Sequence, residues 1–236
     1  MAGRTAGDSA RRARNGRGDA LAPDDPSAVR SVAVVGPMAA GKTTLIEELL
    51  AATGTIPRAG SVTAGTTVTD HDAEARRQQR SVSPAVASLV HRDVKINLID
   101  TPGCPDFLGE VRAGLRAADA VLFVVAPTVE GTAHLRERLK GMADQLGLGA
   151  PDGVPVGVAV VTSYKDRRSA PDLQQLLDSE GLGARVLGVL AHDRKAADAM
   201  RGVGYAGTAR SLLVRSAVEV GARLAALADH RHTPAR

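Results

Sequence analysis

Apolar positions along the chain form short β-branched runs that alternate with longer stretches of helical spacing. The first run covers residues 31–35 and stops at Gly36, and Leu45 and Leu49 then keep a helical period over residues 43–52. Later strand-like runs cover residues 85–90, 94–100, 120–126, 154–162 and 184–190, and later helical patterns cover about 107–118, 132–146, 171–179 and 211–229. Because strands and helices alternate, the pattern predicts an α/β fold with a mostly parallel sheet between two helical layers.

One pair of strands departs from this parallel arrangement. Only His91, Arg92 and Asp93 separate the runs at 85–90 and 94–100, and a connection of this length is too short for a parallel crossover. The sequence therefore predicts a three-layer sandwich whose sheet carries one antiparallel hairpin strand.

Polar segments without an apolar period lie at both ends of the chain and inside it. Residues 1–28 mix Gly, Ala, Arg, Asp and Pro, and we expect a disordered basic leader there, because such a segment buries too little surface to offset its ordering entropy. The folded domain is predicted at 29–230 and a flexible tail at 231–236. Residues 53–80 are rich in Gly, Thr, Asp, Arg and Gln, which favours a mobile loop.

Composition narrows the class of protein. With 236 residues, 44% of them hydrophobic and 24% charged, the chain has a globular balance that excludes fibrous and disordered classes. We find neither an apolar run long enough to span a membrane nor a secretory signal, and we expect a cytoplasmic protein. Its single cysteine, Cys104, excludes an internal disulfide.

The positive charge does not by itself indicate a nucleic-acid surface. Six arginines of the first thirty residues carry much of the net charge of +4, and aromatic residues make up only 2% of the chain. A base-stacking platform is therefore not expected, and we find no direct nucleic-acid motif beyond the basic leader.

A glycine-rich loop between the first strand and the first helix carries the strongest chemical signal. The segment from Gly36 to Thr43 reads Gly-Pro-Met-Ala-Ala-Gly-Lys-Thr and matches the phosphate-loop pattern. Its backbone N–H groups and the helix amino terminus favour bound phosphates, Lys42 contacts β- and γ-phosphate oxygens, and the Thr43 hydroxyl is a ligand for Mg²⁺. The predicted nucleotide-binding residues here are Gly36, Met38, Ala39, Ala40, Gly41, Lys42, Thr43 and Thr44.

A second element, Asp100-Thr-Pro-Gly103, ends the second hairpin strand. At the carboxyl edge of a parallel sheet, Asp100 is placed to hold Mg²⁺ through water, and the Gly103 N–H is placed to sense the γ-phosphate. Together the two elements predict a P-loop NTPase fold that binds a nucleoside triphosphate with Mg²⁺.

Residues 31 to about 130 resemble the GTPase domain of the translational GTPases, most of all their elongation factor G-like branch. The resemblance rests on four segments, 36–44, 60–83, 95–103 and 106–112. It implies a GTP/GDP-binding switch protein, with residues 60–83 as its first switch and residues 103–112 in its second.

The resemblance assigns roles to further residues, and two of these residues differ from the family's own. Ser83 lies near the position of the family's magnesium-binding threonine, and it keeps the hydroxyl. Cys104 stands where the family has a water-positioning histidine, so we expect slow hydrolysis, because a neutral thiol donates hydrogen bonds poorly. His71 or His91 would replace that histidine only if the fold brings it close, and a purely space-filling Cys104 is an open alternative.

Guanine selectivity in the family comes from an Asn-Lys-x-Asp element after a buried strand. By resemblance, Asp166 is the acceptor for the guanine edge, Ser163 stands where Asn would be, and the stem of Lys165 stacks on the base. Asp166 as an ordinary helix cap is the alternative.

The carboxyl part carries a weaker resemblance to partition ATPases of the MinD and ParA group, in segments 125–131 and 184–200. That resemblance makes His192 and Asp193 candidates for adenine packing, with a plain strand-to-helix turn as the alternative.

The sequence thus predicts a GTP-binding protein and GTP hydrolase with catalysis weakened at Cys104. Guanine nucleotide is its expected partner, together with the ribosome by family resemblance, and GTP is favoured over ATP. The resemblance places the domains needed for translocation after the GTPase domain, and we expect this chain to lack them. A MinD/ParA-like ATPase and a nucleotide-holding pseudo-GTPase that serves as a binding module remain the alternatives.

Overall fold

The computed structural model describes residues 26–70, 75, 77, 81–104, 108–148, 150, 152–200 and 211–229. Most of the predicted leader (1–25) and the predicted tail (231–236) lie outside these residues. The short 3₁₀ helix η2 (Pro26–Ala28) leads directly into the first strand.

Six strands form one sheet in the order β2-β3-β1-β4-β5-β6. All neighbouring pairs are parallel except β2 and β3, which are antiparallel. The predicted sheet with a single antiparallel hairpin strand is therefore confirmed. The strands are β1 (Val29–Val35), β2 (Ala85–His91), β3 (Val94–Asp100), β4 (Ala120–Val125), β5 (Val156–Thr162) and β6 (Arg185–Ala191).

The predicted helical segments are all present, with ends shifted by a few residues. One further helix, α7, was not predicted, because seven residues are too few to display a helical period. The helices are α2 (Lys42–Ala52), α4 (Leu108–Arg116), α5 (Val129–Leu146), α6 (Ser169–Ser179), α7 (Arg194–Met200) and α8 (Leu212–Asp229), together with the 3₁₀ helix η4 (Tyr164–Asp166).

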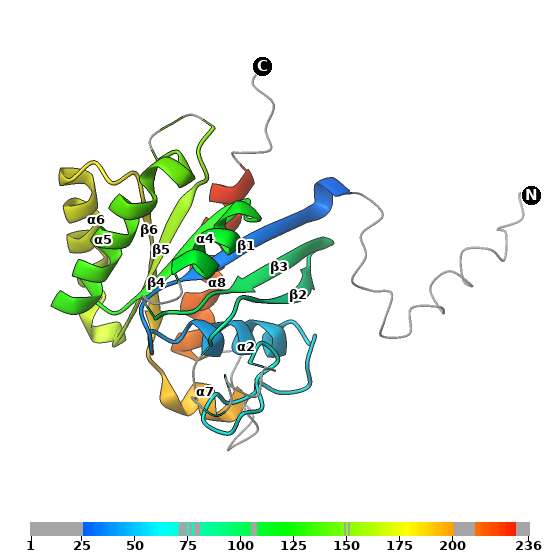
Figure 1. Cartoon of the computed structure of the whole chain (residues 1–236). Coiled ribbons are helices and arrows are strands. Elements are labelled where there is room, and N and C mark those ends of the chain that lie inside the picture. The colour runs from blue at the N-terminus through cyan, green and yellow to red at the C-terminus, as the bar shows by residue number, and fades with distance from the viewer. Residues whose placement is uncertain are drawn as a thin grey trace, which may run out of the picture.

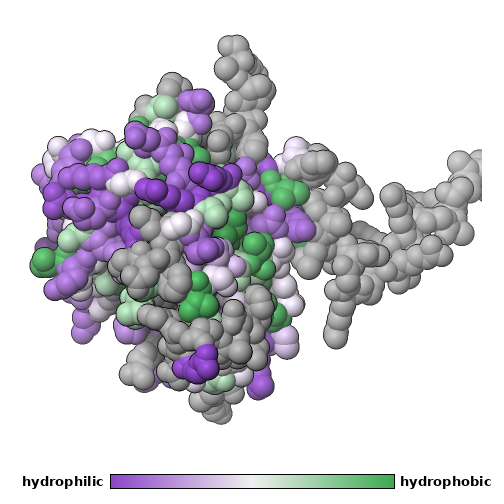
Figure 2. All heavy atoms as spheres, in the orientation of Figure 1, coloured by the Kyte–Doolittle hydropathy of each residue, from purple (hydrophilic) through white to green (hydrophobic). Residues whose placement is uncertain are grey.

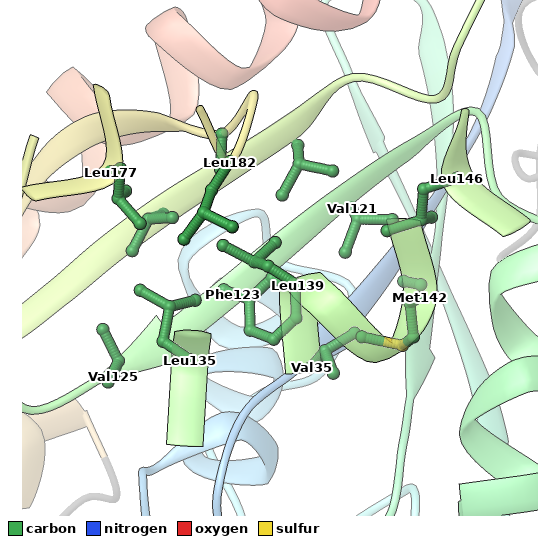
Figure 3. Close-up of a cluster of buried hydrophobic side chains, with 14 of the residues drawn as sticks. Val35, Val121, Phe123, Val125, Leu135, Leu139, Met142, Leu146, Leu177 and Leu182 are labelled. Atoms are coloured by element: carbon green, nitrogen blue, oxygen red, sulfur yellow. The ribbon is translucent and has the colours of Figure 1, made fainter. Parts of the chain in front are cut away.

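Helices cover both faces of the sheet (Figure 1). Buried side chains of α4, α5 and α6 pack on one face, and those of α2 and α8 pack on the other. Figure 3 shows how Leu135, Leu139 and Met142 of α5 lie against Phe123 and Val35 of the sheet. Every residue of β4 is buried, as its continuous apolar sequence predicts for a central strand covered on both faces.

The surface of the described residues agrees with this layering. Figure 2 shows mainly hydrophilic residues on one face, with hydrophobic residues in small separate areas. In the described part of the chain, no helix is long and apolar enough to cross a membrane.

The parallel register brings the ends of the central strands to one edge of the sheet. Val34 of β1 pairs with Asp100 of β3, and Val35 pairs with Phe123 of β4. The loops that follow β1, β3 and β5 therefore leave the sheet at the same edge, which is where ligands bind in open α/β sheets.

Candidate functional site

The loop between β1 and α2 ends in a helix amino terminus that has no side-chain cap. Its N-cap residue, Gly41, has a φ of 89°, a left-handed conformation that glycine adopts at little cost. Ala39 also has a positive φ, of 60°, and the Ala40 N–H bonds to the Pro37 carbonyl at 3.3 Å. Uncapped N–H groups and the helix dipole make this end of α2 suited to an anion.

The predicted phosphate-binding side chains differ in exposure. Met38 and Ala39 are exposed, Ala40 and Thr44 are half-buried, and Lys42 is buried. The Lys42 ammonium donates to the carbonyl oxygens of Gly36 at 3.0 Å and Pro37 at 2.9 Å, so its charge is held inside the loop. Burial lowers the pKa of Lys42, and the Asp100 carboxylate opposes this effect.

Asp100 lies at the end of β3 and is almost fully buried. Its Oδ2 accepts hydrogen bonds from the hydroxyls of Thr43 at 2.7 Å and Thr69 at 3.0 Å. Its Oδ1 is buried and has no hydrogen-bond partner among the described residues. Burial raises the pKa of Asp100 to about 6, although both hydroxyls act in the opposite direction.

These groups fit Mg²⁺, which binds proteins through one or two carboxylates and completes its shell with phosphates and water. The Thr43 hydroxyl and the Asp100 oxygen that lacks a partner among the described residues would supply the hard oxygen ligands that this ion prefers. The described residues contain no group of three or more His, Cys, Asp or Glu side chains arranged for a metal. The site is therefore one in which a nucleotide would have to complete the metal's coordination.

The segment after α2 is anchored to that helix by a buried carboxylate. Glu47 is fully buried, and its two oxygens accept the backbone N–H groups of Gly60 at 2.8 Å and Val68 at 2.5 Å. The mobility predicted for residues 53–80 stays a prediction. The sequence did not indicate this anchor, because a glutamate in a helix ordinarily faces water.

This anchored segment brings polar residues to Thr43 that the sequence analysis missed. Ser81 Oγ lies 3.4 Å from Thr43 Oγ1 and donates to Asp70 Oδ1 at 2.7 Å, while the Thr67 hydroxyl approaches Asp70 Oδ2 at 3.4 Å. Ser83, the predicted metal ligand, is exposed. The structure thus places Ser81 beside the threonine of the phosphate loop, and a metal-binding role for Ser83 stays a prediction.

Gly103 and Cys104 follow Asp100 and lie close to the same loop. A Cβ on Gly103 would be 2.6 Å from both the Lys42 ammonium and the Met38 backbone nitrogen, so only glycine permits this approach. Cys104 is half-buried and is near enough to Arg138 of α5 for an electrostatic interaction. The structure therefore joins the two predicted elements and adds a guanidinium from α5.

A histidine also approaches from α5, one helical turn before Arg138. Burial lowers the pKa of His134, and the positive charges of Arg138 and the phosphate-loop lysine add to this effect. His91 is exposed at the far end of the hairpin from Asp100, roughly 20 Å away by strand geometry, and does not reach the site. His71 lies outside the described residues.

The predicted base-recognition residues follow β5 on the same edge of the sheet. Ser163, Lys165 and Asp166 are all exposed, and the Ser163 hydroxyl accepts the Lys165 backbone N–H at 3.4 Å. Asp166 does not cap the next helix, because the N-cap of α6 is Arg168. The helix-cap alternative for Asp166 is therefore wrong.

His192 and Asp193 form the turn between β6 and α7. The Asp193 carboxylate accepts the Ala196 backbone N–H at 3.1 Å, a contact typical of a helix N-cap. This supports the plain strand-to-helix turn that was the alternative to adenine packing.

An uncapped helix end with a buried lysine, facing a hydroxyl and carboxylate pair, defines a P-loop nucleotide-binding protein. The model of the family described as the elongation factor Tu GTP binding domain matches residues 27–150, more than half of the chain. The chain therefore belongs to this family. The resemblance to the translational GTPases is confirmed.

Individual relatives point to the elongation factor G-like branch. An elongation factor G-like protein of Mycobacterium tuberculosis is 53% identical over 134 residues, which cover 56% of this chain and 19% of that protein. The oxytetracycline resistance protein of Streptomyces rimosus is 44% identical over 109 residues, which cover 46% of this chain and 16% of that protein. A solved structure from Thermus thermophilus has a TM-score of 0.53 and 38% identity, covering 65% of this chain and 22% of that one.

The chain thus spans about a fifth or less of the length of these curated relatives. The comparisons do not favour the partition-ATPase alternative. The predicted base-recognition residues lie beyond the segment that the family model matches.

Proposed function

We propose that this chain is the GTPase domain of an elongation factor G-like protein, a magnesium-dependent guanine-nucleotide switch that works in the cytoplasm with the ribosome. The observation that carries the proposal is the 2.7 Å hydrogen bond between Thr43 and Asp100 beside the uncapped end of α2. It brings together the two sequence elements, 57 residues apart, and so supports a shared site for polyphosphate and metal.

Different groups of the site bind the phosphates and the metal. Lys42 neutralises phosphate charge, and the N–H groups at the start of α2 bind the phosphate oxygens. Thr43 and Asp100 hold Mg²⁺, which when bound neutralises charge on the β- and γ-phosphates. Because Gly103 lies against the phosphate loop, its N–H couples the γ-phosphate to the second switch.

Guanine selectivity is assigned to the exposed residues after β5. The Asp166 carboxylate is free to accept two hydrogen bonds from the guanine edge, whereas adenine offers no matching pair of donors. Asp166→Ala should therefore reduce the preference for GTP over ATP while leaving metal-dependent binding intact. Equal preference in the variant and the wild type would contradict the assignment.

Calorimetric titration with GTP, GDP, ATP and ADP, with and without Mg²⁺, tests the function as a whole. We expect the guanine nucleotides to bind more tightly than the adenine nucleotides and Mg²⁺ to strengthen binding. Lys42→Ala should lose binding, and Lys195→Ala, which removes an exposed lysine on α7, should retain it. No heat with millimolar triphosphate, or unchanged affinity in Lys42→Ala, would refute the proposal.

We further propose that Cys104 weakens hydrolysis. A general acid or base contributes roughly 10²- to 10⁴-fold to a rate, and a thiol beside a guanidinium does not replace an imidazole that orients water. Single-turnover GTP hydrolysis should therefore be slow, and Cys104→His should raise it at least tenfold, whereas Cys104→Ser should not. An unchanged rate in Cys104→His would rule out this account. Hydrolysis near the spontaneous rate, with and without ribosomes, would indicate the pseudo-GTPase alternative.

A further inference from the structure

An arginine of α5 lies beside the phosphate loop without belonging to it. Arg138 is half-buried, and its guanidinium is close enough to Lys42 to lower the pKa of that ammonium. It also interacts with Cys104, the residue that follows Gly103. The guanidinium therefore lies where the phosphate loop meets the Asp100-Thr-Pro-Gly103 element.

The contacts of α5 show which side of the helix carries Arg138. Arg136 and Lys140 face α6, where both bind Glu180 at 2.6 Å and 2.9 Å. On the opposite side, the Gln145 amide donates to a backbone carbonyl of α4 at 2.8 Å, and Figure 1 shows α5 between α6 and α4. Because a helix has 3.6 residues per turn, Arg138 shares the side of Gln145, two turns away, and points away from α6.

The position of Arg138 along α5 brings it level with the phosphate loop. The next residue, Leu139, is fully buried in the same hydrophobic cluster as Val35, which directly precedes that loop (Figure 3). The helix begins at Val129, just after β4, so its amino terminus lies at the carboxyl edge of the sheet. Helical side chains point back toward the amino terminus, and the side chain of Arg138 therefore extends toward the edge where the loop lies.

Positive groups gather at this edge. Arg138 lowers the pKa of both Lys42 and His134, as like charges close to one another do. Within the described part of the chain Arg138 has no hydrogen bond or ion pair, whereas Arg136 on the other side of α5 is paired. Cations that repel each other beside an uncapped helix end cost free energy, and a bound anion with several charges offsets that cost.

We propose that Arg138 binds the γ-phosphate of the nucleotide and thereby distinguishes a triphosphate from a diphosphate. The inference rests on the proposed nucleotide-binding function. It selects the γ-phosphate because Arg138 lies beside Cys104, next to the Gly103 N–H that is assigned to the same phosphate. A guanidinium suits this task, because its planar fork of donors matches two phosphate oxygens and its charge is permanent.

This assignment does not make Arg138 a substitute for a water-positioning imidazole. A guanidinium has no acceptor and keeps its proton, so it cannot take a proton from water. Arg138 supplies charge from α5, while Lys42 supplies charge from the loop. The expectations for hydrolysis at Cys104 therefore stand unchanged.

Calorimetric titration with a non-hydrolysable GTP analogue and with GDP, both in Mg²⁺, tests the inference. Loss of a hydrogen bond to a charged group weakens binding by roughly 10- to 100-fold, which is the effect expected for the analogue with Arg138→Ala. The same variant should keep the GDP affinity within about twofold, since GDP has no γ-phosphate and a half-exposed charge farther away is screened. Arg136→Ala removes the same charge from the other side of the same helix and should leave both affinities within about twofold of the wild type.

The outcomes separate this inference from the proposed function. If the wild type binds neither nucleotide, the proposed function fails and the inference fails with it. If the wild type binds both while Arg138→Ala keeps its affinity for the analogue, or weakens GDP as strongly as the analogue, the assignment of Arg138 is overturned and the proposed function stands. Should circular dichroism show that Arg138→Ala does not fold, Arg138→Gln takes its place, because glutamine keeps much of the side chain without the charge, and the same selective loss is required.

Discussion

Replacing Asp100 by asparagine should change how the stability of the nucleotide-free, metal-free protein depends on pH. Burial raises the pKa of the Asp100 carboxyl from 3.8 to about 6. The unfolded chain releases this proton near 3.8, so between the two values the folded protein binds more protons than the unfolded chain. The contribution of Asp100 to stability is therefore greatest below pH 3.8 and is lost as the pH rises through about 6.

The size of this effect follows from the pKa difference. One pKa unit corresponds to about 1.36 kcal/mol, so the ionised carboxylate costs about 3 kcal/mol of unfolding free energy above pH 6. About 2 kcal/mol of this cost develops between about pH 4.5 and pH 7.5. Asparagine has no proton to release there, and the unfolding free energy of the wild type relative to Asp100→Asn should fall by that amount over this range.

Urea unfolding in the presence of EDTA measures the difference, with far-ultraviolet circular dichroism as the probe, because the chain contains no tryptophan. Comparing the two proteins at each pH cancels the titration of the groups that do not interact with Asp100. Asp152→Asn, which removes an exposed carboxylate, should run parallel to the wild type throughout. Parallel profiles for Asp100→Asn as well would refute the claim that burial dominates the environment of this carboxyl.

Three further substitutions test contacts of the fold and the site. Glu47→Gln should lower the unfolding free energy by roughly 2 kcal/mol and speed tryptic cleavage of the following loop. The reason is that an amide NH₂ group would replace a carboxylate oxygen that now accepts a backbone N–H. An unchanged urea midpoint and cleavage rate would count against the anchor. Gly103→Ala should weaken nucleotide binding at least tenfold in calorimetry, since its Cβ would meet the phosphate loop at 2.6 Å, while Gly109→Ala, with nothing within 4 Å, should bind normally. Leu139→Ala should lower the unfolding free energy measured in urea by roughly 3–5 kcal/mol. The exposed Glu137→Ala should lower it by about 0.5 kcal/mol or less. Equal losses in the two variants would show that the cluster in Figure 3 is not the core.

The elements of the fold were largely predictable because each is encoded locally. The apolar run of β4, the helical period of α5 and the three-residue connection between β2 and β3 each determine their own structure within a few residues. Handedness and pairing rules then leave few ways to assemble them, and the predicted sheet followed. The helix α7 escaped prediction because its seven residues carry no period.

The residues of the candidate site that belong to contiguous motifs were likewise predictable, and those placed by loop closure were not. The phosphate loop and the Asp100-Thr-Pro-Gly103 element are contiguous motifs whose backbone context could be inferred, and the structure brings them together through the β1–β3 register. The choice between Ser81 and Ser83 could not be made this way, because it depends on how a long polar segment closes back on the helix. Loop closure of this kind leaves no periodic signal in the sequence.

The sequence by itself determined the α/β architecture, the phosphate loop and the family, since all three rest on short-range patterns of glycine, charge and apolar residues. Only the tertiary structure showed that Glu47 is buried and anchors the following segment, that Asp70 stands beside Asp100, and that His134 and Arg138 approach from α5. The physical reason is that burial and charge proximity arise between residues far apart in the chain, and they exist only once the helices and loops have packed on the sheet.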